Sequence, residues 1–75
     1  MESQIENILV FATNIKSDND KQKIANVLNK NTEIDQWTLD QEDIDCVLRI
    51  ISDTLSEEQI ITLLYKHNFE CSALE

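Results

Sequence analysis

The sequence predicts an α+β fold in which two helices cover one face of a four-stranded antiparallel sheet. Three observations predict it. Strand-like and helix-like patterns of apolar residues follow one another in the order strand, helix, strand, strand, helix, strand. Both helical segments open with a serine and acidic residues, which is a typical helix start. The 75 residues, 41% of them apolar, suffice for one core and not for two. We therefore expect a single domain over residues 1–75.

The first strand is predicted within the apolar run IENILVFATN, residues 5–14. Because successive positions are apolar without alternation, this strand should lie in the interior of the sheet. A helix should follow from Ser17, with Ile24 and Leu28 on its apolar face. It should end at residues 29–31, where asparagine tolerates the left-handed backbone that glycine usually supplies.

A hairpin is predicted next. Its strands are EIDQWTL, residues 33–39, and CVLRIIS, residues 46–52, and the polar turn DQEDID joins them. In the second of these strands, Leu48 and Ile50 should face one side of the sheet, because side chains alternate along a strand.

The second helix is predicted to begin with Ser56-Glu57-Glu58-Gln59, a capping box. It should end near His67 and Asn68, before a short last strand in FECSAL, residues 69–74. The resulting order, β-α-β-β-α-β, is that of a ferredoxin-like sandwich. In that fold the antiparallel sheet has the strand order 4-1-3-2, with two helices on one face.

Composition excludes several classes of function. A net charge of -9 does not suit phosphate binding, so we expect no nucleic-acid partner. The chain has no glycine, which removes phosphate-binding loops and dinucleotide fingerprints. No apolar run approaches the roughly 18 residues of a membrane span, and the N-terminus lacks the features of a signal peptide. With one histidine and no nucleophile motif, the sequence predicts an acidic, cytoplasmic, non-enzymatic protein without a cofactor or a membrane partner.

The core and capping positions resemble those of one known family. Over roughly residues 8–74 the chain is similar to the heavy-metal-associated domain of copper chaperones and metal-pumping ATPases. That family has Met-x-Cys-x-x-Cys in the loop after its first strand, and Ile15 stands at the position of the methionine. The other matching positions are Val27, Leu28, Ile34, Trp37, Leu39, Cys46, Leu48, Ile50, Leu55, Ser56, Glu57, Glu58, Asn68 and Phe69.

The metal-binding pair of that family is missing. Ser17 and Asp20 occupy the two cysteine positions, and a hydroxyl with one carboxylate does not replace two thiolates around a soft ion. We interpret Ser17 as the N-cap of the first helix and Asp20 as an acid in its first turn. The resemblance therefore implies the fold of the family with a degenerate metal site.

An alternative is metal binding through substitute ligands. In the topology that the resemblance implies, Asp20, Cys46, His67 and Cys71 lie near one end of the sheet, and such a set would suit zinc. Against it, both cysteines are predicted to pack as small apolar residues. They should lie two strand spacings apart, about 10 Å, beyond the roughly 7 Å limit for a disulfide, so we expect free thiols.

The favoured function is protein–protein interaction. If Ile8, Val10 and Ala12 point to the helices, Leu9 and Phe11 point away from them. With Val47 and Ile51 of the third strand, these would form an apolar patch on the helix-free face. We expect this patch to bind a protein partner or a second copy. The acidic hairpin, with Asp40, Glu42, Asp43 and Asp45, is a second candidate surface, for a basic partner.

Overall fold

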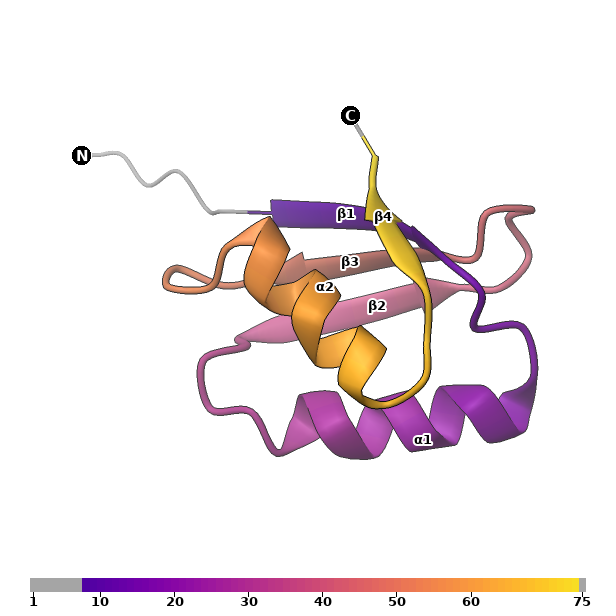
Figure 1. Cartoon of the computed structure of the whole chain (residues 1–75), viewed down its shortest axis with the longest axis horizontal. Coiled ribbons are helices and arrows are strands. Elements are labelled where there is room, and N and C mark those ends of the chain that lie inside the picture. Colours follow the sequence, from indigo (N-terminus) through magenta and orange to yellow (C-terminus); the bar gives the residue numbers. More distant parts are fainter. Residues whose placement is uncertain (1–7, 75) are drawn as a thin grey trace.

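The computed structural model describes residues 8–74 and confirms the predicted α+β class, with two helices and a four-stranded antiparallel sheet (Figure 1). Residues 5–7 of the first predicted strand lie outside the described part of the chain. The last strand is shorter than predicted, three residues in place of six. The elements are β1 (Ile8–Thr13), α1 (Asp18–Asn29), β2 (Gln36–Asp40), β3 (Val47–Ile51), α2 (Glu57–Lys66) and β4 (Cys71–Ala73).

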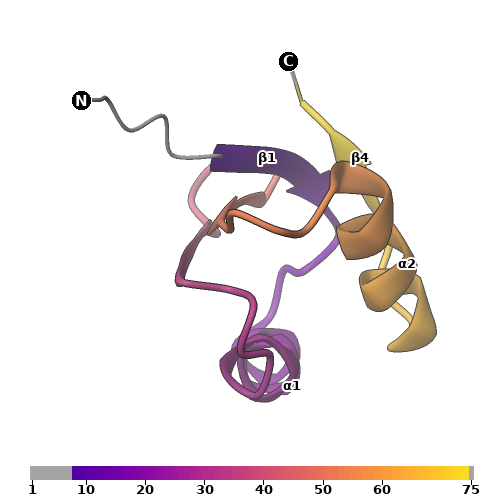
Figure 2. The ribbon, with the colours of Figure 1, turned by 90° about the vertical axis from the view of Figure 1, so that its left-hand side faces the viewer.

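The strands lie in the order β2-β3-β1-β4, so β1 and β3 are interior and β2 and β4 form the edges. All three pairings are antiparallel. Both helices pack on the same face, because their buried residues join one hydrophobic cluster with residues of the sheet. Figures 1 and 2 show that the other face carries no helix. This arrangement is compatible with a ferredoxin-like sandwich.

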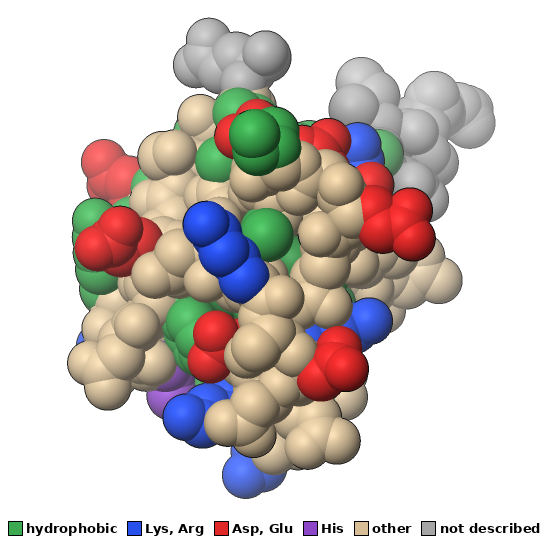
Figure 3. All heavy atoms as spheres, turned by 90° about the vertical axis from the view of Figure 1, so that its right-hand side faces the viewer, with side chains coloured by type: hydrophobic (Ala, Val, Ile, Leu, Met, Phe, Trp, Pro, Cys, Tyr) green, Lys and Arg blue, Asp and Glu red, His purple; other side chains and the backbone are tan. Residues whose placement is uncertain are grey.

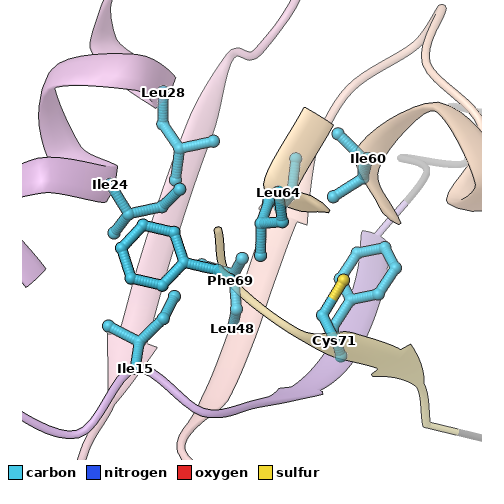
Figure 4. Packing of buried hydrophobic residues seen from close by; sticks show 10 residues of the cluster. Ile15, Ile24, Leu28, Leu48, Ile60, Leu64, Phe69 and Cys71 are labelled. Carbon is cyan, nitrogen blue, oxygen red and sulfur yellow. The ribbon is translucent and has the colours of Figure 1, made fainter. Parts of the chain in front are cut away.

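The core lies between the sheet and the two helices. Each helix contributes two fully buried aliphatic residues one turn apart, as the period of a helix requires. Figure 4 shows these side chains meeting residues of the sheet and of the connecting segments. The buried cluster consists of Phe11, Ile15, Ile24, Leu28, Leu48, Ile50, Ile60, Leu64, Phe69 and Cys71.

Both helices begin at the predicted serines. At α1, Ser17 Oγ accepts a hydrogen bond from the Asp20 backbone N–H at 3.0 Å. At α2, Ser56 Oγ accepts from the Gln59 N–H at 3.2 Å, and Gln59 Oε1 accepts from the Ser56 N–H at 2.8 Å. Of the two described helices, only α2 has this reciprocal capping box. In α1, by contrast, Asp20 contributes its backbone N–H to the cap.

The end of α1 differs from the prediction in one respect. The helix ends at Asn29 as expected, but the next residue, Lys30, keeps a right-handed backbone with φ of -82°. The Asn31 N–H donates to the Leu28 carbonyl at 3.1 Å, which tightens the last turn. Because this tight turn satisfies a terminal carbonyl, no asparagine has to take the left-handed conformation here.

The left-handed asparagine lies instead at the end of α2. Asn68 has φ of 68°, and its N–H donates to the Tyr65 carbonyl at 3.0 Å. The Phe69 N–H donates to the Leu64 carbonyl at 3.0 Å. These two bonds form a Schellman motif, in which asparagine takes the position usually held by glycine. The motif also directs Phe69 back into the core, where it is 5% exposed.

One buried polar side chain ties two loops together. Ser52, fully buried after the end of β3, donates its hydroxyl to the Glu33 carbonyl at 2.6 Å. Its oxygen accepts from the Thr54 N–H at 3.3 Å and from the Leu55 N–H at 3.1 Å. A single hydroxyl thus satisfies three backbone groups and joins the loop before β2 to the loop before α2. This role of Ser52 was not predicted from the sequence.

Candidate functional site

The helix-free side of the sheet carries an apolar strip along β1 and β3, which we call the open face. In the register of these strands, Ile8 is opposite Ile51 and Val10 is opposite Arg49. Cross-strand partners share a face of the sheet, and residues two apart on one strand do so as well. Val47 therefore lies on the same side. The open face consists of Ile8, Val10, Val47, Arg49 and Ile51.

Exposure varies along the open face. Ile8 is 53% exposed, whereas Val10 and Ile51 are half-buried and Val47 is 5% exposed. Arg49 is exposed in the middle of the strip. The arrangement offers apolar contact area and one guanidinium with five hydrogen-bond donors. Its chemistry suits binding a protein surface with an acceptor opposite Arg49.

The assignment of Leu9 and Phe11 to the open face is wrong. Phe11 is fully buried in the core and pairs with Leu48, and Leu9 packs against the core opposite Ile50. Both sets of alternate residues in β1 are apolar, so the sequence of this strand does not show which set faces the helices. The exposed Arg49 of the partner strand decides it only once the register of β1 and β3 is known. The exposed charge of Arg49 marks its own cross-strand partner as facing away from the helices.

The loop before α1 is organised by hydrogen bonds between side chains and the backbone. Thr13 Oγ1 accepts from the Ile15 N–H at 3.2 Å and donates to the Cys46 carbonyl at 2.7 Å. Gln41 Nε2 donates to the Ser17 carbonyl at 3.0 Å. Ile15, within this loop, is fully buried. The loop is therefore fixed between β1 and the β2–β3 hairpin, and Ser17 is occupied as a helix cap.

Three loops meet at this end of the sheet. The Thr13 N–H donates to the Asp45 carbonyl at 2.9 Å, and the Asn14 N–H donates to the Glu70 carbonyl at 3.2 Å. Glu70 returns a bond from its N–H to Asn14 Oδ1 at 3.0 Å. The loop after β1 thus contacts both the β2–β3 hairpin and the turn before β4.

The four substitute metal ligands are not brought together. Within residues 8–74, no group of three or more His, Cys, Asp or Glu side chains could hold a metal ion. Cys71 joins the hydrophobic core, and burial raises the pKa of its thiol from 9.0 to about 11. His67 Nδ1 donates to the Leu63 carbonyl at 3.0 Å, so it serves the end of α2. Cys46 and Cys71 are buried free thiols.

Cys46 occupies a special backbone position. It precedes β3 with a left-handed φ of 46°, and its N–H donates to the Asp43 carbonyl at 2.9 Å. A non-glycine residue in this region is uncommon, and it marks a tight junction between the hairpin turn and the strand. The side chain is 4% exposed. The position of Cys46 is therefore explained by the turn and by packing.

Aspartate side chains stabilise the acidic hairpin turn through hydrogen bonds to its own backbone. Asp40 Oδ1 accepts from the Glu42 N–H at 3.1 Å, and Asp43 Oδ1 accepts from the Asp45 N–H at 2.9 Å. These are the short side-chain-to-backbone bonds that favour aspartate in turns. Figure 3 shows acidic and basic side chains interspersed on this side of the molecule. The acidic residues of the turn are better explained by these hydrogen bonds than by a single acidic docking surface.

Two shallow clefts lie on the surface of the described region. The larger, of about 380 Å³, is lined by Asn31 and by α2 and the residues before it, including Leu55, Leu63 and Lys66. The smaller, of about 320 Å³, lies beside β4 and includes Tyr65 and Cys71. Both are wide open to solvent.

Comparison with known proteins returns no relative: no family model, curated protein or solved structure matches the chain. Among the helices of residues 8–74, none is long and apolar enough to cross a membrane.

Proposed function

We propose that this chain is a small, non-enzymatic protein-interaction module with a ferredoxin-like fold, similar to heavy-metal-associated domains and lacking their soft-metal site. The element order and the strand order β2-β3-β1-β4 support the fold proposal. The burial of Ile15, within the loop before α1, supports the resemblance. The capping role of Ser17 supports a structural use of this loop.

The open face carries the proposal of protein interaction. A sheet needs only one apolar face to pack against its helices, and the second face of an antiparallel sheet is usually polar. Here Ile8, Val10 and Ile51 keep apolar surface on that second face, beside the exposed Arg49. Contiguous apolar surface of this kind is typical of a binding site.

The test compares a double variant of the open face with a control. Val10→Thr with Ile51→Thr makes the strip polar while keeping residues that favour strands. Gln22→Ala changes an exposed position on α1 and serves as the matched control. Tagged wild type and both variants are used to capture partners from cells that express the protein, and urea unfolding confirms that all three are folded.

A partner that is captured by wild type and control, and lost with the double variant, supports the proposal. Equal capture by all three proteins would show that the open face is not the binding site. Isothermal titration of the purified partner then gives the change in affinity. For an apolar strip of this size we expect at least a tenfold weakening, equivalent to about 1.4 kcal/mol.

The resemblance has a separate test at the loop before α1. Ser17→Cys combined with Asp20→Cys restores the two thiolates of the similar family at its own spacing. The double variant should bind one Cu(I) in competition with a chelator under reducing conditions, whereas the wild type should bind none. A folded double variant without Cu(I) affinity would contradict the resemblance and leave the open-face proposal untouched.

A further inference from the structure

The two edges of the sheet differ in how well they are protected. β4 is a three-residue strand, and a short edge offers little to pair with. β2 is longer, with five residues, and its residues Gln36, Thr38 and Asp40 are exposed. Natural edge strands are commonly blocked by lysine or proline, and β2 contains neither.

The hydrogen-bond pattern shows which backbone groups of β2 point outward. The Asp35 N–H donates to the Ile51 carbonyl at 2.8 Å, so Ile51 directs its backbone groups toward β2. Gln36 is the register partner of Ile51, and bonded pairs recur at every second residue of an antiparallel ladder. Thr38 and Asp40 therefore bond inward as well. The intervening residues, Trp37 and Leu39, direct their N–H and C=O groups to the outer edge.

From this edge we propose that two copies of the chain associate through β2, antiparallel, with Thr38 opposite Thr38 of the second copy on a two-fold axis. In this register Trp37 is opposite Leu39 of the second copy, and each such pair exchanges both of its N–H···O bonds. Gln36 is opposite Asp40. The two four-stranded sheets become one continuous sheet.

The side chains fit this self-pairing. An aromatic residue faces an aliphatic one, threonine faces threonine, and an amide faces a carboxylate, and all three are favourable cross-strand pairs. No like charges stand directly opposite each other within Gln36–Asp40. This matters in a chain with a net charge of -9, for which most random contacts between copies place acids together.

Neighbouring registers use the edge less completely. With Trp37 opposite Trp37, Leu39 meets Asp35, whose N–H is already bonded within its own sheet. With Leu39 opposite Leu39, Trp37 meets Gln41, beyond the end of β2 and engaged with the loop before α1. The register centred on Thr38 therefore satisfies the outward groups of both Trp37 and Leu39.

The association should be weak and dependent on salt. Pairing of two five-residue strands is a small interface, so we expect a dissociation constant on the order of 1 mM. Added salt should strengthen the dimer, because it screens the repulsion between two acidic chains. The bonds of this interface come from the backbone edge of β2, so the variant Val10→Thr with Ile51→Thr, on β1 and β3, should leave it intact.

Disulfide trapping tests the register directly. Residues opposite each other in a non-hydrogen-bonded pair have Cα atoms about 4.5 Å apart, within the range for a disulfide. Thr38→Cys should therefore form a covalent dimer rapidly under mild oxidation at high protein concentration. Gln36→Cys is the matched control, since two copies of position 36 would lie about 13 Å apart along the strands. The native thiols are buried and form a low background.

Charge variants at one position test the same geometry in solution. Gln36→Lys places a cation opposite Asp40 of the second copy, and Gln36→Asp places a carboxylate there. Sedimentation equilibrium from about 10 μM to about 2 mM should show Gln36→Lys about fivefold tighter than wild type and Gln36→Asp about fivefold weaker. The same changes at Gln22, on the exposed side of α1, control for net charge and should shift the equilibrium much less.

Three results would overturn the proposal. The first is a wild type that stays monomeric to about 2 mM in high salt. The second is equal cross-linking rates for Thr38→Cys and Gln36→Cys. The third is a dimer whose dissociation constant responds to Gln36 and Gln22 variants alike. Circular dichroism of each variant shows that it is folded, so a lost dimer reports on the edge.

Discussion

The two faces of the sheet carry similar apolar residues but differ in how deeply these are buried. On the covered face, Phe11, Leu48 and Ile50 are fully buried beneath the helices. On the open face, Val10 and Ile51 belong to the same two strands, yet both are half-buried. Apolar content is therefore no guide to which face of β1 is the core. The helices decide it, because they remove one side of the sheet from water.

A core substitution should give the largest difference between the faces. Phe11→Ala leaves a cavity beneath the helices, and such a change in a core costs about 3–5 kcal/mol of the free energy of unfolding. Val10→Ala, the adjacent position on the open face, should cost less than about 1.5 kcal/mol. Urea unfolding followed by Trp37 fluorescence measures both. Similar costs at the two positions would mean that the open face is covered in solution.

Much of the fold could be predicted because its signals are local. Ser17 and Ser56 each bond within the first turn of their own helix, so a four-residue window suffices to identify them. The orientation of β1 could not be predicted in the same way. It depends on pairing with Leu48 and Ile50, about 40 residues away along the chain, and on the position of the helices.

A buried polar side chain just after the end of β3 should also be costly to lose. Ser52→Ala removes one hydroxyl and leaves the Glu33 carbonyl and two backbone N–H groups without their partner. We expect the free energy of unfolding to fall by about 2 kcal/mol. Ser72→Ala is the control: Ser72 is exposed and pairs with Ala12 of β1, and its loss should cost less than about 0.5 kcal/mol. Chemical denaturation of both variants would reveal equal costs if the Ser52 network were unimportant.

The buried thiol of Cys71 predicts how stability depends on pH. The fold holds this thiol neutral, with a pKa near 11, while the unfolded chain ionises it near 9. Between these values the unfolded state loses its proton first, so the free energy of unfolding falls as pH rises. We expect a loss of roughly 1 kcal/mol between pH 8 and pH 10 from this group. Below pH 8 the group has no effect.

A variant isolates this contribution from that of the lysines. Cys71→Ala removes the thiol and keeps every other titrating group, so the difference between its pH profile and that of the wild type belongs to Cys71. Parallel profiles from pH 8 to pH 10 would contradict burial of the neutral thiol. The rate of modification by a thiol reagent should likewise be far lower in the folded wild type than in urea.

The candidate site illustrates why function was harder to predict than fold. Asp20, Cys46, His67 and Cys71 are residues with suitable chemistry, but each one has a local structural task, and no three of them come together to hold a metal ion. Conversely, Ser52 has an unremarkable sequence context, and its partner Glu33 lies 19 residues away. The spacing of residues along the chain predicts local hydrogen bonds well, but it predicts contacts between distant residues poorly.

The smallest expected effect separates two positions of the open face that differ in burial. Val10→Thr replaces a methyl group by a hydroxyl at a half-buried position, where water can bond to it, and should change the free energy of unfolding by less than about 0.5 kcal/mol. Val47→Thr makes the same replacement at a position that is only 5% exposed, so an unpartnered hydroxyl should cost about 1 kcal/mol. Thermal unfolding of the two variants measures the difference. If Val10→Thr is the costlier change, Val10 is covered in solution and is not part of a surface available to a partner. If the order is as expected, partner binding should weaken with Val10→Thr at almost unchanged stability, which is the signature of a residue kept apolar for an interface.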